Sequence, residues 1–162
     1  MPEVIGNTSP LRYLHQLGLL HLLPALTERV IVPPAVAEEL TAGRARGVDL
    51  PDLQALDWVT IRHPVSEAAL PLVNDLGPGE TEVLALALES GDAIVIIDDA
   101  LARQVAETLG IRLIGTLGVL LDAKRAGLVP AVAPLLDQLQ ALRFRLASHT
   151  RAAVLELAGE IE

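Results

Sequence analysis

Residues Ser90 to Asp99 read Ser-Gly-Asp-Ala-Ile-Val-Ile-Ile-Asp-Asp, and this stretch decides the fold class. Its centre, Ala93 to Ile97, is an unbroken apolar and mostly β-branched run, which predicts a strand buried on both faces. The Ser-Gly-Asp turn before it and the two aspartates after it bound the strand. Because strands buried on both faces belong to parallel sheets covered by helices, the stretch indicates an α/β domain.

Short β-branched runs alternate with helical segments on either side of this strand. Four further strands are expected, at Pro2–Ile5, Arg29–Val32, Trp58–Ile61 and Ile111–Ile114, with the third possibly at an edge. Helices are expected at Leu11–Leu17, Leu19–Leu26, Ala35–Leu40, Pro64–Val73, Glu80–Glu89, Leu101–Leu109 and Thr116–Arg125, and two more from Pro130 and from about His149. The alternation predicts a central, mostly parallel sheet of four to five strands flanked by helices. We expect residues 1–130 to form the sheet domain and residues 131–162 a C-terminal helical extension of it.

The composition limits the class of protein. A length of 162 residues suits one domain, and a hydrophobic fraction of 51% excludes intrinsic disorder. The chain has no cysteine, which excludes disulfides and thiolate metal sites. Its apolar runs are too short to span a bilayer, and Met1-Pro2-Glu3 opens no secretory signal. We therefore expect a cytoplasmic protein that has no contact with a membrane.

The net charge of −9 argues against nucleic-acid binding through the overall field of the protein. Aromatic residues are few, so an extended stacking platform for bases is not expected. If phosphates are bound, metal ions and a local arginine patch must offset the acidic background. Candidates for such contacts are Arg44 and Arg46, Lys124-Arg125 and Arg143-Phe144-Arg145, although solvated surface charge is the more common role of such residues. A partner with a basic surface would also suit this charge.

Polar side chains follow three of the expected strands. Asn7 follows the first strand, Asp98 and Asp99 follow the fourth, and Thr116 follows the fifth. Ligands of open parallel sheets bind at the carboxyl ends of the strands, so we expect these side chains to lie near one another.

Two glutamates on neighbouring helices, Glu39 and Glu80, would add carboxylates at that edge. Oxygen ligands of this kind suit Mg²⁺ or Mn²⁺. Each acid also has a purely structural explanation. Glu80 would favour a helix dipole, and Asp98 or Asp99 could be an ordinary helix cap. Two adjacent aspartates exceed what one cap needs, and like charges repel unless a cation or donors lie close.

Other sites are poorly supported. The chain has no glycine-rich dinucleotide motif and no phosphate-binding loop with its lysine. The four histidines lack zinc spacing, and Ser9 has no evident partners for a nucleophilic triad.

The order of four segments resembles the motifs of PIN-domain nucleases. The segments are Val4–Leu11, Val32–Leu40, Leu76–Ala87 and Ile96–Thr116, within a resemblance that covers roughly residues 3 to 130. The stretch Gly115–Leu120 is similar to a branch related to the VapC-like toxins of toxin–antitoxin pairs. The resemblance implies a PIN-like three-layer α/β fold.

It also implies Mg²⁺- or Mn²⁺-dependent hydrolysis of RNA phosphodiester bonds. Catalytic positions would fall on Asn7, Glu39, Glu80 and Asp99, metal ligands on Glu39, Glu80, Asp98 and Asp99, and supporting hydrogen-bond donors on Thr8, Ser9 and Thr116. Which aspartate matches the family acid is ambiguous, although the spacing to Ala106 favours Asp99. Family members are often homodimers inhibited by a small antitoxin protein.

Asn7 departs from the family pattern, in which this position is usually aspartate. An amide can bind a metal through its carbonyl oxygen, but it brings no charge and is a poor base. The sequence therefore leaves a second hypothesis open, a weak or inactive PIN-like module that binds a protein partner or structured RNA. A third hypothesis is an α/β domain that binds a small molecule in an apolar pocket at the same edge.

Overall fold

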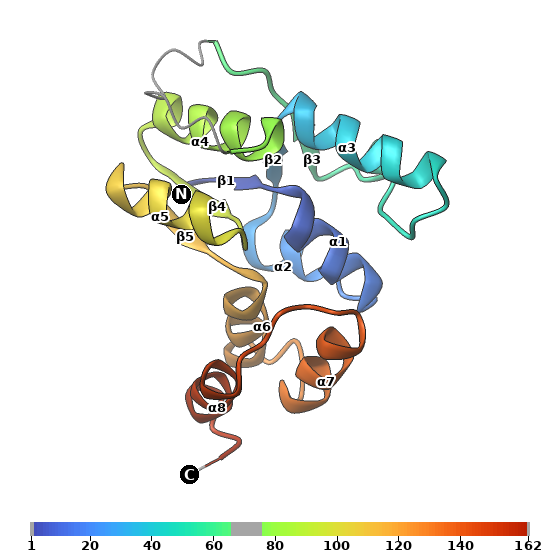
Figure 1. Cartoon of the computed structure of the whole chain (residues 1–162), viewed down its shortest axis with the longest axis vertical. Helices are drawn as coiled ribbons and strands as arrows, with labels where there is room; N and C mark the ends of the chain where they lie inside the picture. Colours follow the sequence, from blue (N-terminus) through green and yellow to red (C-terminus); the bar gives the residue numbers. More distant parts are fainter. Residues whose placement is uncertain (1, 66–75, 162) are drawn as a thin grey trace.

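The computed structural model describes residues 2–65 and 76–161, and its centre is a five-stranded sheet in which every pairing is parallel (Figure 1). The strands are β1 (Glu3–Gly6), β2 (Val30–Val32), β3 (Val59–Ile61), β4 (Ala93–Ile96) and β5 (Arg112–Ile114). Their order in the sheet is β3-β2-β1-β4-β5, which makes the first strand of the chain the central one. The expected parallel α/β sheet is confirmed, with β3 and β5 at its edges.

Helices cover both faces of the sheet. They are α1 (Thr8–Gln16), α2 (Leu22–Thr27), α3 (Pro34–Ala45), α4 (Pro78–Ser90), α5 (Ala100–Thr108), α6 (Thr116–Arg125), α7 (Ala133–Ala141) and α8 (Ser148–Leu157), with a 3₁₀ turn η1 (Leu53–Ala55). On one face α4 packs against β1, β4 and α3, while α2 packs against α6 below the sheet in Figure 1. Beyond α6 lie α7 and α8, at the C-terminal end of the chain.

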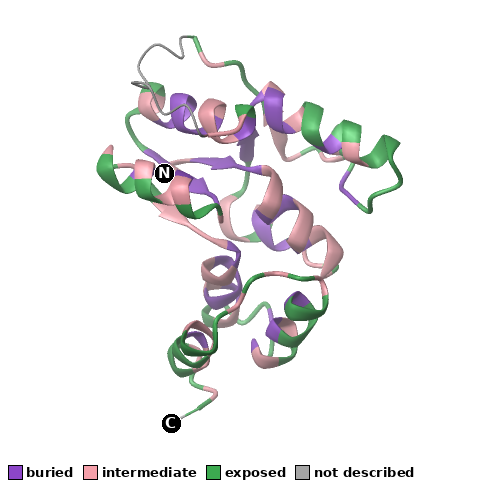
Figure 2. Cartoon of the chain, viewed as in Figure 1, coloured by how far each residue is buried: buried purple, intermediate pink, exposed green. Residues whose placement is uncertain are grey.

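The central pair of strands is fixed by its register and its burial. Four residue pairs join β1 to β4, from Glu3 opposite Ala93 to Gly6 opposite Ile96. The fourth strand is largely buried, as expected, since Ala93, Val95 and Ile96 are buried and Ile94 is half-buried. Figure 2 colours the chain by burial and shows the buried residues gathered in the sheet and on the helix faces that pack against it. Both strands end at the same edge, where their following residues begin the connections to α1 and α5.

Several helix boundaries differ from those expected. The first helix begins at Thr8, not at Leu11, because Asn7 already has the extended backbone of an N-cap. The third continues to Ala45, so Arg44 lies on a helix and not in a loop. The helix expected at Pro64–Val73 falls largely outside the described residues. Since these limits depend on one or two backbone angles, hydrophobic periodicity locates them poorly.

A carboxylate fastens the C-terminal helices to the rest of the chain. Glu160, which follows α8, accepts hydrogen bonds from the backbone N–H groups of Val132 (2.7 Å) and Ala133 (3.0 Å), and from Lys124 Nζ (2.9 Å). These donors, the two backbone groups first, lower the pKa of Glu160 to about 2. Glu160 therefore joins the end of α8 to the start of α7 and to α6. Within the described ranges, no helix combines the length and the apolar character needed to cross a bilayer.

Candidate metal and nuclease site

Asn7 lies where β1 passes into α1, at the centre of the carboxyl edge of the sheet. Its backbone N–H donates to Ile96 O (3.0 Å), which ties the residue to β4. Although Asn7 occupies the N-cap position, its side chain caps nothing. The residue is 2% exposed, and its Oδ1 atom has no hydrogen-bond donor among the described residues. A buried carbonyl oxygen without a partner is costly, so this atom is suited to accept a cation or a donor from a ligand.

Glu39 meets Asn7 at a glycine. Its Oε2 atom accepts a hydrogen bond from Thr8 Oγ1 (2.5 Å), which joins α3 to the start of α1. A Cβ atom on Gly79 would lie 2.8 Å from Glu39 Oε1 and 3.3 Å from Asn7 Oδ1. Both oxygens therefore lie within 3.3 Å of one point, close against the first turn of α4. Glycine at this helical position provides space and not an unusual backbone angle, a role that the Gly-Pro-Gly turn could have signalled.

The two glutamates of α4 act differently from each other. Glu80 is in the first turn, and its Oε2 atom would lie 2.7 Å from a Cβ on Gly77, so its carboxylate turns back toward the helix N-terminus. That placement suits the helix dipole. Glu82 Oε1 accepts the backbone N–H of Ala35 (2.9 Å) at the start of α3. Glu82 was not among the residues expected at the site, and its carboxylate fixes α3, and hence Glu39, against α4.

Asp98 lies between β4 and β5 and is satisfied by one partner. Thr116 donates its backbone N–H to Asp98 Oδ1 (2.8 Å) and its hydroxyl to Oδ2 (2.6 Å). Arg103 is close by, since a Cβ on Gly115 would lie 2.7 Å from Arg103 Nη1 and 2.9 Å from Asp98 Oδ1. Burial raises the pKa of Asp98 above its ordinary value, against the lowering effect of the Thr116 hydrogen bonds and the Arg103 charge. The expected role of Thr116 as a hydrogen-bond donor at the site thus has a specific recipient.

Asp99 has the structural role that a helix cap predicts. It is exposed, and its Oδ2 atom accepts the backbone N–H of Ala102 (2.9 Å) at the start of α5. The two adjacent aspartates therefore have different roles. Asp99 caps α5, and Asp98 accepts hydrogen bonds from Thr116 at the start of α6. Both aspartates lie at nearly the same spacing from Ala106, so spacing does not distinguish these roles.

The candidate residues share one edge of the sheet without forming one compact cluster. Asn7, Thr8 and Glu39 gather at Gly79, whereas Asp98 is held by its partners near β5. In residues 2–65 and 76–161, no group of three or more histidine, aspartate or glutamate side chains is arranged to hold a metal ion. The structure therefore supplies an oxygen pair at Asn7 and Glu39 that fits a divalent ion in part, with water or substrate oxygens left to complete the shell.

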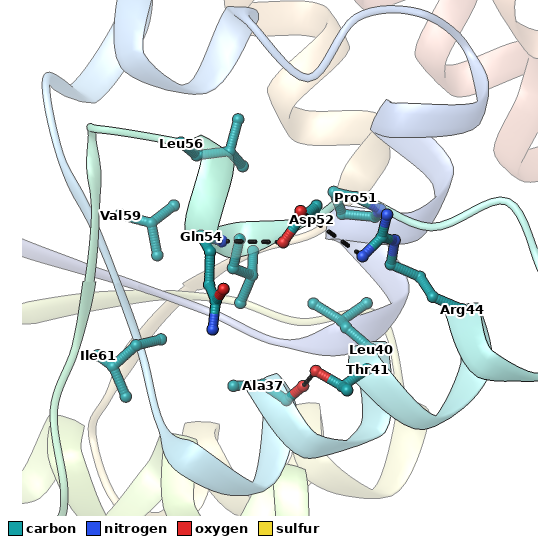
Figure 3. A pocket seen from close by; sticks show the side chains of 11 residues that line it. Ala37, Leu40, Thr41, Arg44, Pro51, Asp52, Gln54, Leu56, Val59 and Ile61 are labelled. Carbon is teal, nitrogen blue, oxygen red and sulfur yellow. Dashed lines mark hydrogen bonds and ion pairs between the residues drawn. The ribbon is translucent and has the colours of Figure 1, made fainter.

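Three other residues were expected to take part in the site, namely Ser9, Arg44 and Arg46. Ser9 is half-buried in the first turn of α1. Arg44 is ion-paired with Asp52 (3.6 Å) beside a pocket of about 430 Å³ between α3 and β3, which Figure 3 shows. Arg46 is exposed at the C-cap of α3. Because α3 carries both arginines beyond Glu39 and toward its C-terminus, they lie at the end of the helix farther from Gly79.

Comparison with known proteins gives the class that this geometry suits. A family model described as a PIN domain matches residues 3–160, which is nearly the whole chain, and the protein belongs to that family. Its fold is therefore a nuclease fold, of a kind that typically depends on a divalent metal. A search of curated proteins finds no significant match to this chain.

Proposed function

We propose that this protein is a Mg²⁺- or Mn²⁺-dependent endoribonuclease that hydrolyses RNA phosphodiester bonds. The observation that supports this most directly is Asn7 Oδ1, buried and without a donor among the described residues, beside the Glu39 carboxylate. A neutral oxygen and a carboxylate that converge on one point are hard ligands, which suit these cations.

The roles of the residues follow from their contacts. Asn7 and Glu39 would hold the ion, with Thr8 orienting the Glu39 carboxylate through its hydrogen bond. Asp98, which follows β4, would supply negative charge to the site, and two hydrogen bonds from Thr116 orient its carboxylate. A divalent ion bound there would polarise a phosphoryl oxygen and lower the pKa of a bound water. Glu80 and Asp99 stay in the proposed metal set as weaker candidates, since each is also used at a helix N-terminus.

The test is cleavage of a mixed RNA pool by the purified protein in Mn²⁺, Mg²⁺ and EDTA. Two pairs of neighbouring acids provide matched controls. Glu39→Gln should abolish metal-dependent cleavage, whereas Glu38→Gln, a change at an exposed neighbour on the same helix, should preserve it. Asp98→Asn should reduce cleavage more than Asp99→Asn, because asparagine at position 99 keeps an oxygen that can accept the Ala102 N–H and cap α5.

A second measurement separates metal binding from activity. Mn²⁺ should raise the melting temperature of the wild type, because a ligand that binds only the folded state stabilises it. Asn7→Asp should enlarge this shift by adding a charge to the pair. If Glu39→Gln and Asp98→Asn both cleaved RNA as the wild type does, the assignment would be wrong.

A catalytically weak or inactive PIN-like module is the second candidate. The amide at Asn7 and the full hydrogen bonding of Asp98 within the protein favour it. Such a module would bind structured RNA or a protein partner, and Mn²⁺ would not change its melting temperature. Cleavage gained in Asn7→Asp would show that the amide alone weakens the enzyme, whereas no gain would indicate a module that has lost catalysis in other ways.

The remaining proposals concern the location, the partner, the oligomeric state and the domain division of the protein. We propose that the protein acts in the cytoplasm as the toxin of a toxin–antitoxin pair, in the VapC-like branch, as a homodimer bound by a small antitoxin. The acidic net charge of −9 suits a basic partner segment. Coexpression with the protein encoded beside it, followed by copurification and light scattering, tests the partner and the oligomeric state. The division into residues 1–130 and a helical extension at 131–162 also stands as a proposal.

A further inference from the structure

A pocket of about 440 Å³ opens beside Asp98 and is lined by neither Asn7 nor Glu39. We call it the Asp98 pocket. One wall comes from the end of β4, from α5, β5 and the start of α6, and the other from the segment between α7 and α8 and the first turn of α8. The side chains that matter here are those of Asp98, Arg103, Leu117, Phe144, Arg145 and Thr150. The C-terminal segment thus supplies one wall of a pocket whose other wall carries an acid of the proposed site.

The pocket is cationic within an acidic protein. Arg103 donates from Nη1 to Ile97 O (3.2 Å), which fixes its guanidinium at the floor beside Asp98. Arg145 is exposed and forms no ion pair among the described residues, whereas Arg62 and Arg151 are each paired with an acid. An unpaired guanidinium at the rim of a pocket is available for the phosphate of a ligand.

An aromatic side chain lines the same wall and is held in place by α1. Phe144 makes an edge-to-face contact with Tyr13, with ring centroids 5.0 Å apart. The guanidinium of Arg12 lies 5.5 Å from the Tyr13 ring centroid, and its buried Nε has no acceptor among the described residues. The wall is therefore anchored to the helix that begins after Asn7. One fixed ring is enough for one base, although the chain lacks the aromatics for a longer platform.

The backbone that presents this wall is strained. Arg143, at the end of α7, has φ +69°, a left-handed conformation that is unfavourable for a residue with a side chain. The turn is closed by hydrogen bonds from Arg143 N to Gln140 O (3.0 Å) and from Phe144 N to Leu139 O (2.9 Å). Helices commonly end in this way with glycine. Here the turn places Phe144 and Arg145 on consecutive positions of the pocket wall.

We propose that the Asp98 pocket binds one nucleotide of single-stranded RNA next to the scissile phosphodiester, an inference that rests on the proposed function. Arg145 contacts the phosphate of that nucleotide, and Phe144 stacks on its base. Arg103 keeps Asp98 charge-compensated at the junction between this pocket and the proposed metal site. The C-terminal helices would then serve to hold a substrate-binding wall in place.

The test measures binding and catalysis separately. The binding probe is a fluorescein-labelled, mixed-sequence RNA of twelve nucleotides, titrated with the full-length protein in EDTA and followed by anisotropy. Arg145→Ala and Phe144→Leu should each weaken the affinity about 5- to 100-fold, in keeping with the loss of one phosphate or stacking contact. Phe144→Trp should retain affinity because it keeps a ring. Arg29→Ala removes the same charge at the amino end of β2, away from the Asp98 pocket, and this variant should bind RNA as the wild type does.

Hydrolysis of bis-p-nitrophenyl phosphate in Mn²⁺ reports on the proposed metal site alone, since this substrate has no base. We expect Arg145→Ala to raise the KM for RNA in step with the weaker binding seen by anisotropy, whereas Arg29→Ala should leave both the KM and the small-substrate hydrolysis unchanged. Equal RNA affinity of wild type, Arg145→Ala and Phe144→Leu would overturn the pocket assignment. If the wild type hydrolysed neither substrate, the catalytic proposal would fail, and the anisotropy comparison in EDTA would still decide the pocket.

Discussion

Replacing Glu160 by glutamine should reveal how strongly the C-terminal helices are fastened. In the wild type the carboxylate accepts two backbone N–H groups and the Lys124 ammonium, which lowers its pKa from 4.5 to about 2. A difference of that size corresponds to at most about 3 kcal/mol in the free energy of unfolding at neutral pH, and screening by solvent reduces it. Glutamine keeps one acceptor oxygen and loses the charge, so we expect a loss of about 1 to 2 kcal/mol.

The sign of the pH dependence follows from the lowered pKa. Because the folded pKa lies below the unfolded value, the stabilisation is complete above pH 4.5 and is lost as the pH falls toward 2. The difference between wild type and Glu160→Gln should be constant from pH 7 to about 5. Below 4.5 it should shrink by up to about 1.4 kcal/mol for each pH unit.

Urea unfolding followed by far-UV circular dichroism at pH 7, 5, 4 and 3.5 measures this difference. Glu156→Gln is the matched control, since Glu156 is exposed on α8, and its substitution should change the free energy of unfolding by less than about 0.5 kcal/mol. A Glu160→Gln protein as stable as wild type at pH 7 would refute the reasoning. So would a deficit that stays the same at pH 3.5.

Three further predictions concern the site and the backbone. Gly79→Ala should leave the fold intact but weaken the Mn²⁺-induced rise in melting temperature, because its Cβ would displace the Glu39 carboxylate; an unchanged rise would contradict this. Glu28→Gly should stabilise the protein by about 1 kcal/mol in urea unfolding, because Glu28 has φ +70° at the end of α2; a loss of stability would count against the strain. Asp98→Asn should gain stability relative to wild type as the pH rises above 4, since a raised folded pKa means stabilisation lost on ionisation; a gap independent of pH would show otherwise.

The fold could be predicted from the sequence because its signals are repeated along the chain. The helix Thr116–Arg125 has the limits expected from its glycine stops, and the buried strand before Asp98 carries an unambiguous apolar run. The edge position of β3 also follows from its short, mixed sequence. Such features depend on many residues at once, so a single misplaced boundary does not alter them.

The details of the site depend on single contacts, which periodicity does not encode. Asp98 and Asp99 are adjacent and identical in type, yet one caps a helix and the other bonds Thr116. Neither the clamp of Glu82 on α3 nor the clamp of Glu160 on α7 has a local signature, since each partner lies more than 25 residues away. These contacts exist only after helices have packed against the sheet, and one sequence read alone does not specify that packing.

The position of β1 at the middle of the sheet divides the molecule into two consecutive pieces. The chain up to β3 contributes β1, β2 and β3, the chain from α4 onward contributes β4 and β5, and the two pieces meet along β1–β4 and α3–α4. The proposed site straddles this seam, with Asn7 and Glu39 on one piece and Gly79 and Asp98 on the other. Under the proposed function, a nascent chain that ends at β3 lacks Gly79 and Asp98 and should not cleave RNA, and a protein cut between the pieces should regain activity only when they reassociate.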